Sequence, residues 1–407
     1  MASNEDFAVS FYEEPQWNSQ PAWKLPGWGE PVIVACILVG SMIVSRRRGY
    51  RIFDTTKREY GLLNVEPGYA RTSDNITRDS SDTDSSIDIV STSKHLSKKR
   101  RCCWATFYTP STSRFANHYH SRLLQRFPFL IEMFYWIITY AFYRCTSILA
   151  QSVFSKTPIW DVAQDHALAV LEFEQFSWLS FLFPISEVEF QSWFMDGHET
   201  FLTILNRTYA LIHIPGTVGF IGWWYYAAPS HASFAVVRRT MTLTNFVAFV
   251  MFICYPCMPP RLLPQEYGFL DSVRHDDAQS VWMKGKYVNS LAAMPSMHFG
   301  YAFCIGCTLL YHSGCGRRTL ERGEVRKSKS LALFYALSGI VYPSWILITI
   351  VATANHFYLD AFVAFFVVII AFFCNKVFLV FLPLEDWLLW AMRLDKPVPT
   401  TGDRLKT

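Results

Sequence analysis

Charged side chains are scarce in this sequence of 407 residues. Asp, Glu, Lys and Arg together make up 17% of the chain, whereas hydrophobic residues make up 51%. A chain so poor in charge is too apolar for an ordinary soluble domain. The net charge is only +4, with basic and acidic residues interleaved, which argues against a nucleic-acid partner. We therefore expect a protein that lies in a lipid bilayer.

The sequence also shows little sign of disulfide chemistry, although it contains ten cysteines. Cys254, Cys304, Cys307 and Cys374 lie inside apolar runs, where cysteine packs as a small hydrophobic residue rather than pairing or binding metal. The Cys-Cys pair at 102–103, beside basic residues, is a weak palmitoylation signal. We expect no disulfide.

Apolar windows of roughly twenty residues are long enough for membrane-spanning helices, and about seven windows approach that length. They cover residues 28–45, 128–151, 200–227, 240–258, 294–313, 331–353 and 357–383. The first is short and is followed by three arginines, which is typical of an anchor rather than a cleaved signal peptide. The expected fold class is all-α, a polytopic bundle of membrane helices.

Lys and Arg are distributed unevenly between these windows. Sixteen of them lie in 46–127 and six in 314–330, whereas 152–199 has one against eight acidic residues. Because cytosolic loops retain positive charge, the first two segments should be cytosolic and the third lumenal. The N-terminus should then lie outside and the C-terminus inside.

Five regions follow from these patterns. Residues 46–127 contain a long polar stretch that cannot bury enough apolar surface to fold alone, so we expect a disordered linker. The expected regions are a lumenal tail (1–27), a first span (28–45), the cytosolic linker (46–127), a membrane catalytic domain (128–390) and a cytosolic tail (391–407). Residues 162–183 resemble an amphipathic helix on the outer surface.

Four ionisable residues fall at span ends on the same expected side of the membrane. They are Arg261, His298, His356 and Asp360. His356 and Asp360 are four residues apart, so on one helix face the carboxylate can hold a ring N–H and leave the other nitrogen free. A nucleophilic imidazole, a second histidine as acid and an arginine for anionic charge are the parts of a phosphoryl-transfer site. A polar network that merely ties helices together is the alternative.

Three segments of the sequence carry a family resemblance. The segments "PPR" at 259–261, "PSMH" at 295–298 and "HFYLD" at 356–360 resemble the signatures of the type 2 phosphatidic acid phosphatase superfamily. The set is most similar to the branch that contains fungal inositol phosphorylceramide synthase. The resemblance covers about residues 160–380.

The resemblance implies a role for each of these residues. His356 would be the nucleophile that forms a phosphohistidine, Asp360 would orient it, and His298 would be the general acid for the departing alcohol. Ser296 and Arg261 would hold the phosphoryl oxygens. The superfamily implies no metal and no cofactor.

The chain departs from many members of the superfamily at one position. Six residues before the expected nucleophile, where many members carry arginine, this chain has Ile350. The inositol-transferring branch often lacks that arginine too. Arg274, Lys284 and Lys286, in the loop expected to cover the site, are candidate substitutes for phosphate binding. His213, near Pro215, is expected to satisfy a backbone carbonyl rather than to take part in catalysis.

Two reactions remain open for such an intermediate. The group could pass from phosphatidylinositol to an alcohol such as ceramide, or to water, as in a lipid phosphate phosphatase acting on phosphatidic acid. An inactive lipid-binding or scrambling protein is the alternative of another class, and the spans disfavour a haloperoxidase. The expected partners are membrane lipids, and the expected place is the lumenal face of the Golgi or endoplasmic reticulum, with the plasma membrane as the alternative. The oligomeric state stays open.

Overall fold

The protein is mostly helical in the parts that the computed structural model describes. These parts are residues 26–53, 98–102, 105–153, 159–176, 181, 184–275, 291–317, 319, 324 and 326–403. The N-terminal half of this fold contains α2 (Gly29–Val44), α4 (Tyr119–Arg126), α5 (Phe129–Val153), α6 (Ile159–Phe176), α7 (Glu187–Met195), α8 (Glu199–Arg207) and α9 (His213–Ala227). The C-terminal half contains α10 (His231–Cys254), α11 (Ser272–His275), α12 (Met297–Ser313), α13 (Lys329–Ala352), α14 (Tyr358–Cys374) and α15 (Leu382–Ala391). The expected all-α fold class is confirmed.

Three helices are long and apolar enough to cross a membrane. Among the described residues they are α10, α13 and the continuous helical stretch Tyr358–Ala391, which runs from α14 through a 3-10 turn into α15. They mark the chain as an integral membrane protein. The other expected windows also form helices, but α2 and α12 have 16 and 17 residues and fall short of the length that a span needs. Seven spans therefore stays a prediction.

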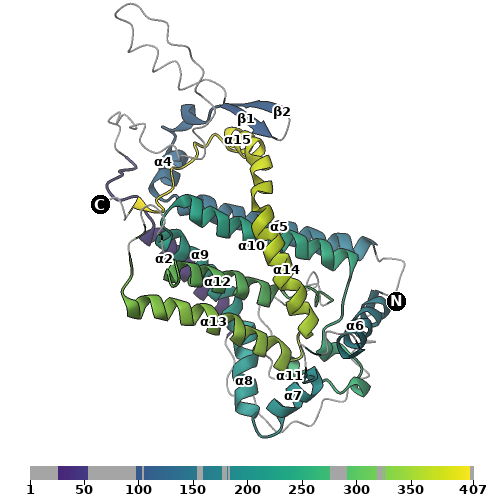
Figure 1. Cartoon of the computed structure of the whole chain (residues 1–407). Coiled ribbons are helices and arrows are strands. Elements are labelled where there is room, and N and C mark those ends of the chain that lie inside the picture. Colours follow the sequence, from purple (N-terminus) through teal and green to yellow (C-terminus); the bar gives the residue numbers. More distant parts are fainter. Residues whose placement is uncertain are drawn as a thin grey trace, which may run out of the picture.

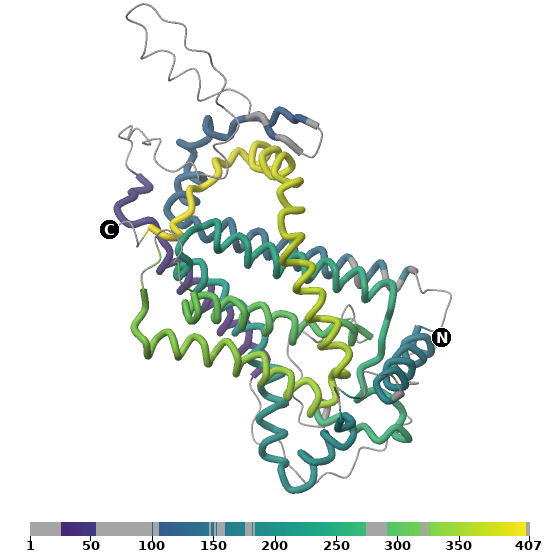
Figure 2. The backbone as a smooth tube through the Cα atoms, in the orientation of Figure 1, coloured from purple at the N-terminus to yellow at the C-terminus, as the bar shows by residue number. Residues whose placement is uncertain are grey.

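Helices α12 and α13 pack closely against each other and lie side by side in Figures 1 and 2. Gly306 and Gly339 face each other there: a Cβ on Gly306 would come within 2.5 Å of the Gly339 carbonyl oxygen. A Cβ on Gly339 would come within 2.8 Å of the Gly306 carbonyl oxygen. Only glycine allows the two backbones this approach, as small residues do in membrane helix pairs.

Helix α14 packs on both α10 and α12. Hydroxyl caps fix where two of the helices begin. The side chain of Ser230 accepts a hydrogen bond from the Ser233 amide at the start of α10, and Ser296 accepts one from the Phe299 amide at the start of α12. Gly314, with φ of 73°, ends α12.

Part of the expected disordered linker is folded. Residues 98–102 and 105–109 form the antiparallel strands β1 and β2, and α4 follows them. Two contacts hold the hairpin to α15: Arg100 pairs with Asp386 at 2.9 Å, and Thr109 donates to the same carboxylate at 2.8 Å. The sequence pattern missed this because the partner carboxylate lies far along the chain. Residues 54–97 lie outside the described part of the chain.

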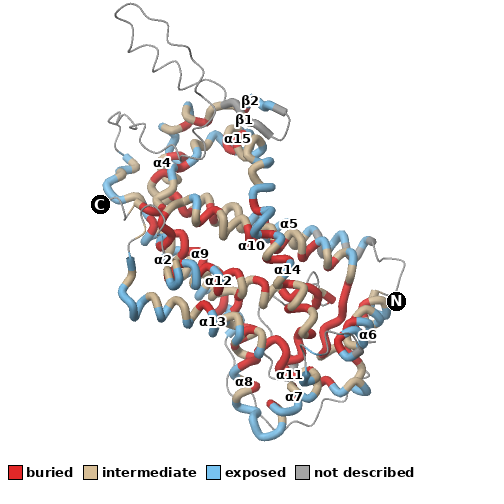
Figure 3. The backbone as a smooth tube through the Cα atoms, in the orientation of Figure 1, coloured by how far each residue is buried: buried red, intermediate tan, exposed pale blue. Residues whose placement is uncertain are grey.

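The helices between α5 and α9 gather at one end of the bundle, beside the start of α14 (Figures 1 and 2). The expected amphipathic helix is α6, but its inner face packs on protein. Ala163, Ala167, Val170 and Glu174 are all buried and lie on one side of the helix. Figure 3 shows buried backbone concentrated where this end of the bundle meets α12 and α14.

Candidate active site

Three segments far apart in the sequence meet at this end of the bundle. The segment after α10 is tied to the turn before α14 by a hydrogen bond from the Arg261 amide to the Ala354 carbonyl (2.8 Å). The start of α12 is tied to α14 by a hydrogen bond from the Ser296 amide to the Asp360 carbonyl (3.1 Å). The structure therefore brings Arg261, Ser296, His298, His356 and Asp360 together at one end of the bundle.

Two oxygens hold the ring of His356 in one orientation. Its Nδ1 lies 2.8 Å from the Ala293 carbonyl oxygen and 3.3 Å from Asp360 Oδ2. A carbonyl oxygen can only accept, so Nδ1 carries the hydrogen and donates it, which leaves Nε2 as the free nitrogen of the neutral ring. The expected contact with Asp360 is present, and the closer contact with Ala293 was not foreseen.

Asp360 is fully buried and organises the turn before its own helix. Its Oδ2 also accepts a hydrogen bond from the Phe357 amide at 2.9 Å, one residue after His356. A carboxylate at a helix N-terminus is stabilised by the amides that have no partner inside the helix. The same group therefore caps α14 and orients the imidazole.

His298 lies in a stack of rings. The ring centroid of Tyr209 is 4.1 Å away and nearly parallel, that of His213 is 4.1 Å away on a tilt, and that of His356 is 5.9 Å away. Tyr209 belongs to a π-helical turn, Thr208–Ile212, that joins α8 to α9. Such turns are often found at functional sites.

The place of His213 differs from the sequence expectation. Its Nδ1 is buried and has no hydrogen-bond partner in the described part of the chain, and its ring faces His298 instead. The irregular turn that precedes it redirects the side chain by an amount that regular helical spacing does not predict. The available signal was a histidine in an apolar helix, which by default marks a functional site.

The side chains of Arg261 and Ser296 both make hydrogen bonds within the protein. The Arg261 Nε donates to Asn355 Oδ1 at 3.0 Å, and its Nη1 donates to Asp271 Oδ2 at 2.8 Å. These bonds point the guanidinium toward the turn that carries His356, and neither of them uses Nη2. The Ser296 oxygen caps α12, while its hydroxyl hydrogen can still be donated.

The three additional candidates for phosphate binding stay predictions. Arg274 lies in α11, but its side chain is outside what the structure describes. Lys284 and Lys286 lie outside the described residues altogether. Ile350, at the position where the resemblance leads one to expect arginine, is fully buried, and its carbonyl accepts hydrogen bonds from the Asn355 and His356 amides.

The turn before His356 holds an unusual backbone conformation. Ala354 is buried and has φ of 49°, in the left-handed region that residues other than glycine avoid. Its carbonyl accepts the Arg261 amide, so the strained residue also aligns the arginine segment with the histidine segment. Strain of this kind collects at functional sites, where surrounding contacts hold it in place.

Sequence reasoning also missed two carboxyl groups beside the site. Glu174 of α6 accepts a hydrogen bond from the Leu359 amide, and Glu187 of α7 accepts one from the Tyr358 amide at 3.2 Å. Both side chains are buried. The available signal was an acidic residue on the apolar face of α6, in line with Ala163, Ala167 and Val170.

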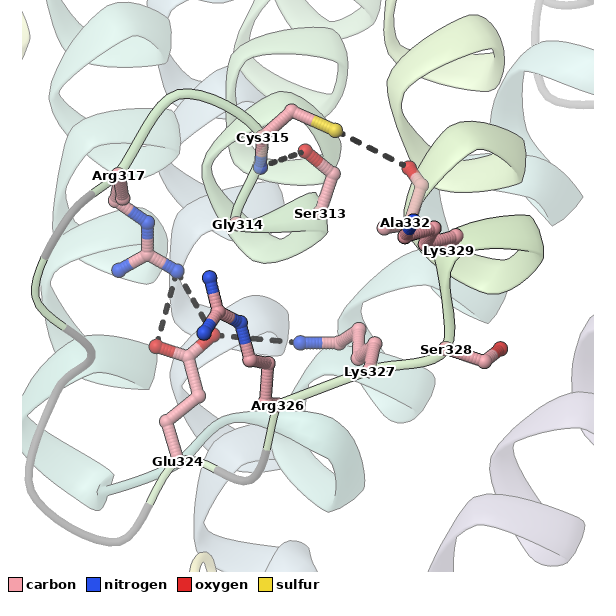
Figure 4. A pocket seen from close by; sticks show the side chains of 10 residues that line it. All are labelled: Ser313, Gly314, Cys315, Arg317, Glu324, Arg326, Lys327, Ser328, Lys329 and Ala332. Atoms are coloured by element: carbon pink, nitrogen blue, oxygen red, sulfur yellow. Dashed lines mark hydrogen bonds and ion pairs between the residues drawn. The ribbon is translucent and has the colours of Figure 1, made fainter.

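A cavity elsewhere in the bundle does not belong to this site. It has a volume of about 740 Å³, and Ser313, Arg317 and Glu324 help to line it (Figure 4). Ser313 ends α12, whereas His298 lies at its start, so the cavity is at the opposite end of that helix.

In the part of the chain that is described, no three His, Cys, Asp or Glu side chains form a group that could hold a metal ion.

Comparisons with known proteins bear on the same region. Neither the curated proteins nor the solved structures gave a match. One protein-family model matches residues 169–320, a range that includes Arg261, Ser296 and His298 and ends before His356. That model describes the PAP2 superfamily, and the match supports this superfamily, with phosphatase or phosphotransferase chemistry, for the chain.

Proposed function

We propose that the protein is a membrane-embedded lipid phosphotransferase that works through a covalent intermediate on His356. The observation that carries the proposal is the geometry of that ring. Its Nδ1–H is held by the Ala293 carbonyl and Asp360, and its other edge is left for an electrophile while the His298 ring lies 5.9 Å away. An oriented imidazole next to a second histidine is the arrangement that nucleophilic catalysis with acid assistance requires.

In the first step, the lone pair of His356 Nε2 attacks the phosphorus atom of a lipid phosphodiester. The bond from phosphorus to the lipid alcohol oxygen breaks, its electron pair stays on that oxygen, and His298 supplies the proton. Arg261 and the Ser296 hydroxyl donate to the other phosphoryl oxygens, where charge gathers in the transition state. The products are the free lipid alcohol and a His356 that carries the phosphate with its headgroup still attached.

In the second step, an acceptor hydroxyl attacks the same phosphorus atom. Its proton passes to His298, which lost one in the first step, and the bond from phosphorus to Nε2 breaks with its electron pair returning to the ring. The active site is then in its starting state. Donor, acceptor and proton balance within these residues, so the cycle needs no further reactant.

Transfer to an alcohol is favoured over transfer to water by how little of His356, the proposed nucleophile, is exposed. His356 is 5% exposed, and Asp360 and Ser296 are fully buried. A transferase must keep water from its intermediate, and burial does this. The sequence resemblance makes phosphatidylinositol the proposed donor and ceramide the proposed acceptor, at the lumenal face of an endomembrane. Hydrolysis of phosphatidic acid is the second candidate, and the superfamily match supports it equally.

Product analysis distinguishes the two. Purified protein in detergent is given labelled phosphatidylinositol with and without ceramide or, in a separate reaction, phosphatidic acid. The His356→Ala variant is assayed beside it. The proposal predicts diacylglycerol and a new phosphoinositol lipid that appear only with ceramide and only with His356. Release of phosphate from phosphatidic acid, with no product from phosphatidylinositol, would identify a phosphatase instead.

A further inference from the structure

The N-terminus of α14 is held by carboxyl groups from three different helices. Three successive amides are involved: Phe357 donates to Asp360, Tyr358 to Glu187, and Leu359 to Glu174. These amides have no partner inside the helix, so each needs an acceptor from elsewhere. The first acceptor comes from α14 itself, whereas Glu187 comes from α7 and Glu174 from α6.

Glu174 has an oxygen that its hydrogen bond to α14 does not use. Its Oε1 accepts the Leu359 amide, while Oε2 is buried and has no partner among the described residues. Glu187 is the neighbouring group, and it too is buried. Two carboxylates in such a place repel each other, and one proton between them turns the repulsion into a hydrogen bond. A proton on Glu174 Oε2 thus satisfies the oxygen that otherwise has none.

The local charges agree with this placement of the proton. Burial raises the pKa of Glu174 to about 10, and the hydrogen bond and charge of Glu187 add to the effect. The hydrogen bond from the Leu359 amide lowers the pKa of Glu174, whereas the charge of Asp360 raises it. The other titratable groups around the pair are Tyr358 of α14 and Cys257 in the segment after α10.

We propose that Glu174 is a protonated positioning residue of the active site. Its neutral carboxyl group, hydrogen-bonded to Glu187, fastens α6 and α7 to the start of α14 and so fixes the turn that carries His356 and Asp360. The role as a positioning residue rests on the proposed function, whereas the shared proton does not. Glutamine has the same shape as a protonated glutamate, with one acceptor oxygen and one donor, so it provides a direct test.

The test compares Glu174→Gln and Glu174→Ala in the full chain, with Glu172→Gln as control because Glu172 is exposed on the same helix. Turnover is measured at pH 7. We expect Gln to retain kcat within about twofold and Ala to lose roughly 10- to 100-fold in kcat with little change in KM, as a displaced catalytic group does. Equal losses in both variants would contradict the proposal.

Thermal unfolding gives a second measurement that does not depend on activity. The pKa of Glu174 is raised from 4.5 to about 10 in the folded protein. Between these two pH values the folded protein therefore keeps a proton on Glu174 that the unfolded chain has lost. Wild-type stability should therefore fall as pH rises through this window, and Glu174→Gln should not share that loss. The Tm of Glu174→Gln relative to wild type should rise between pH 5.5 and pH 8.5, with no such trend for Glu172→Gln.

The two measurements separate the possible failures. A Tm difference that stays flat or falls with pH would show that Glu174 is ionised, and the shared proton would be wrong. A rising Tm difference together with an active His356→Ala variant would leave the shared proton in place and remove the proposed function. A rising Tm difference with full activity in Glu174→Ala would overturn the positioning role alone.

Discussion

The ring of His213 lies 4.1 Å from the ring of His298, with no hydrogen-bond partner for its Nδ1 among the described residues. With Tyr209 at the same distance, it limits the orientations that His298 can adopt. Packing of this kind fixes the direction in which the ring nitrogens of His298 point. The contact thus links a π-helical turn, which no local sequence pattern announces, to the proposed proton donor.

A change at His213 tests this contact. His213→Phe keeps a flat ring and removes a buried nitrogen without a partner, whereas His213→Ala leaves a cavity beside His298. We expect Phe to retain most of kcat and to unfold at the same or a higher temperature, and Ala to lose roughly tenfold in kcat. Steady-state kinetics and thermal unfolding of the two variants measure this. Wild-type kcat in His213→Ala would show that the ring contact has no part in turnover.

Asp360 and the Ala293 carbonyl both accept the Nδ1 hydrogen of His356, so replacing Asp360 should lower turnover without abolishing it. In Asp360→Asn, the Ala293 carbonyl still accepts the Nδ1 hydrogen of His356, so the ring keeps its orientation and loses a stabilising charge. We expect kcat to fall by roughly 100- to 10,000-fold, short of the complete loss in His356→Ala. Single-turnover rates of the two variants measure the difference. Equal rates in Asp360→Asn and wild type would contradict a role for the carboxylate.

The glycine contact between α12 and α13 makes a prediction about folding. Gly306→Ala places a Cβ 2.5 Å from the Gly339 carbonyl oxygen, and because backbone cannot rotate away, the helices must separate. We expect a loss of about 1–3 kcal/mol in the free energy of unfolding. Gly216→Ala is the control, since its Cβ would meet nothing closer than 3.7 Å. Equal stability of the two variants would show that the helices do not need the close approach.

The arrangement of the membrane helices can be tested by labelling. Lys329 lies at the start of α13 and Glu199 at the start of α8, and both are exposed. The distribution of Lys and Arg predicts that they face opposite sides of the membrane. In a chain without native cysteines, Lys329→Cys should react with an impermeant reagent from the cytosolic side and Glu199→Cys from the lumenal side of sealed vesicles. Labelling of both from one side would remove the proposed orientation.

Much of the architecture could be predicted because it depends on local patterns. Apolar windows of about twenty residues give the helices, and the spacing of His356 and Asp360 places both groups at the start of α14. The meeting of the histidine and arginine segments followed from the expected side of each span end. The three segments do meet, with Arg261 bonded to the turn at Ala354.

The supporting contacts could not be predicted, because each joins residues that are distant in the chain. Ala293 holds His356 through a backbone carbonyl, which has no sequence signature. Glu174 bonds to α14 across 185 residues of sequence. The acidic residues of α6, to which it belongs, resemble those of any exposed helix. The folded hairpin before α4 depends on Asp386, likewise far along the chain. Long-range pairs of this kind appear only once the helices are placed.

The most direct test of the central claim is to look for the transferred group on His356. Purified protein is mixed with labelled phosphatidylinositol in the absence of acceptor, and the reaction is quenched in alkali. The mass of the peptide that contains His356 is then measured by mass spectrometry. The account predicts an acid-labile phosphoinositol group on that histidine, its loss on addition of acceptor, and neither label nor turnover in His356→Ala. Turnover that persists in His356→Ala, with no label on the wild-type peptide, would contradict it.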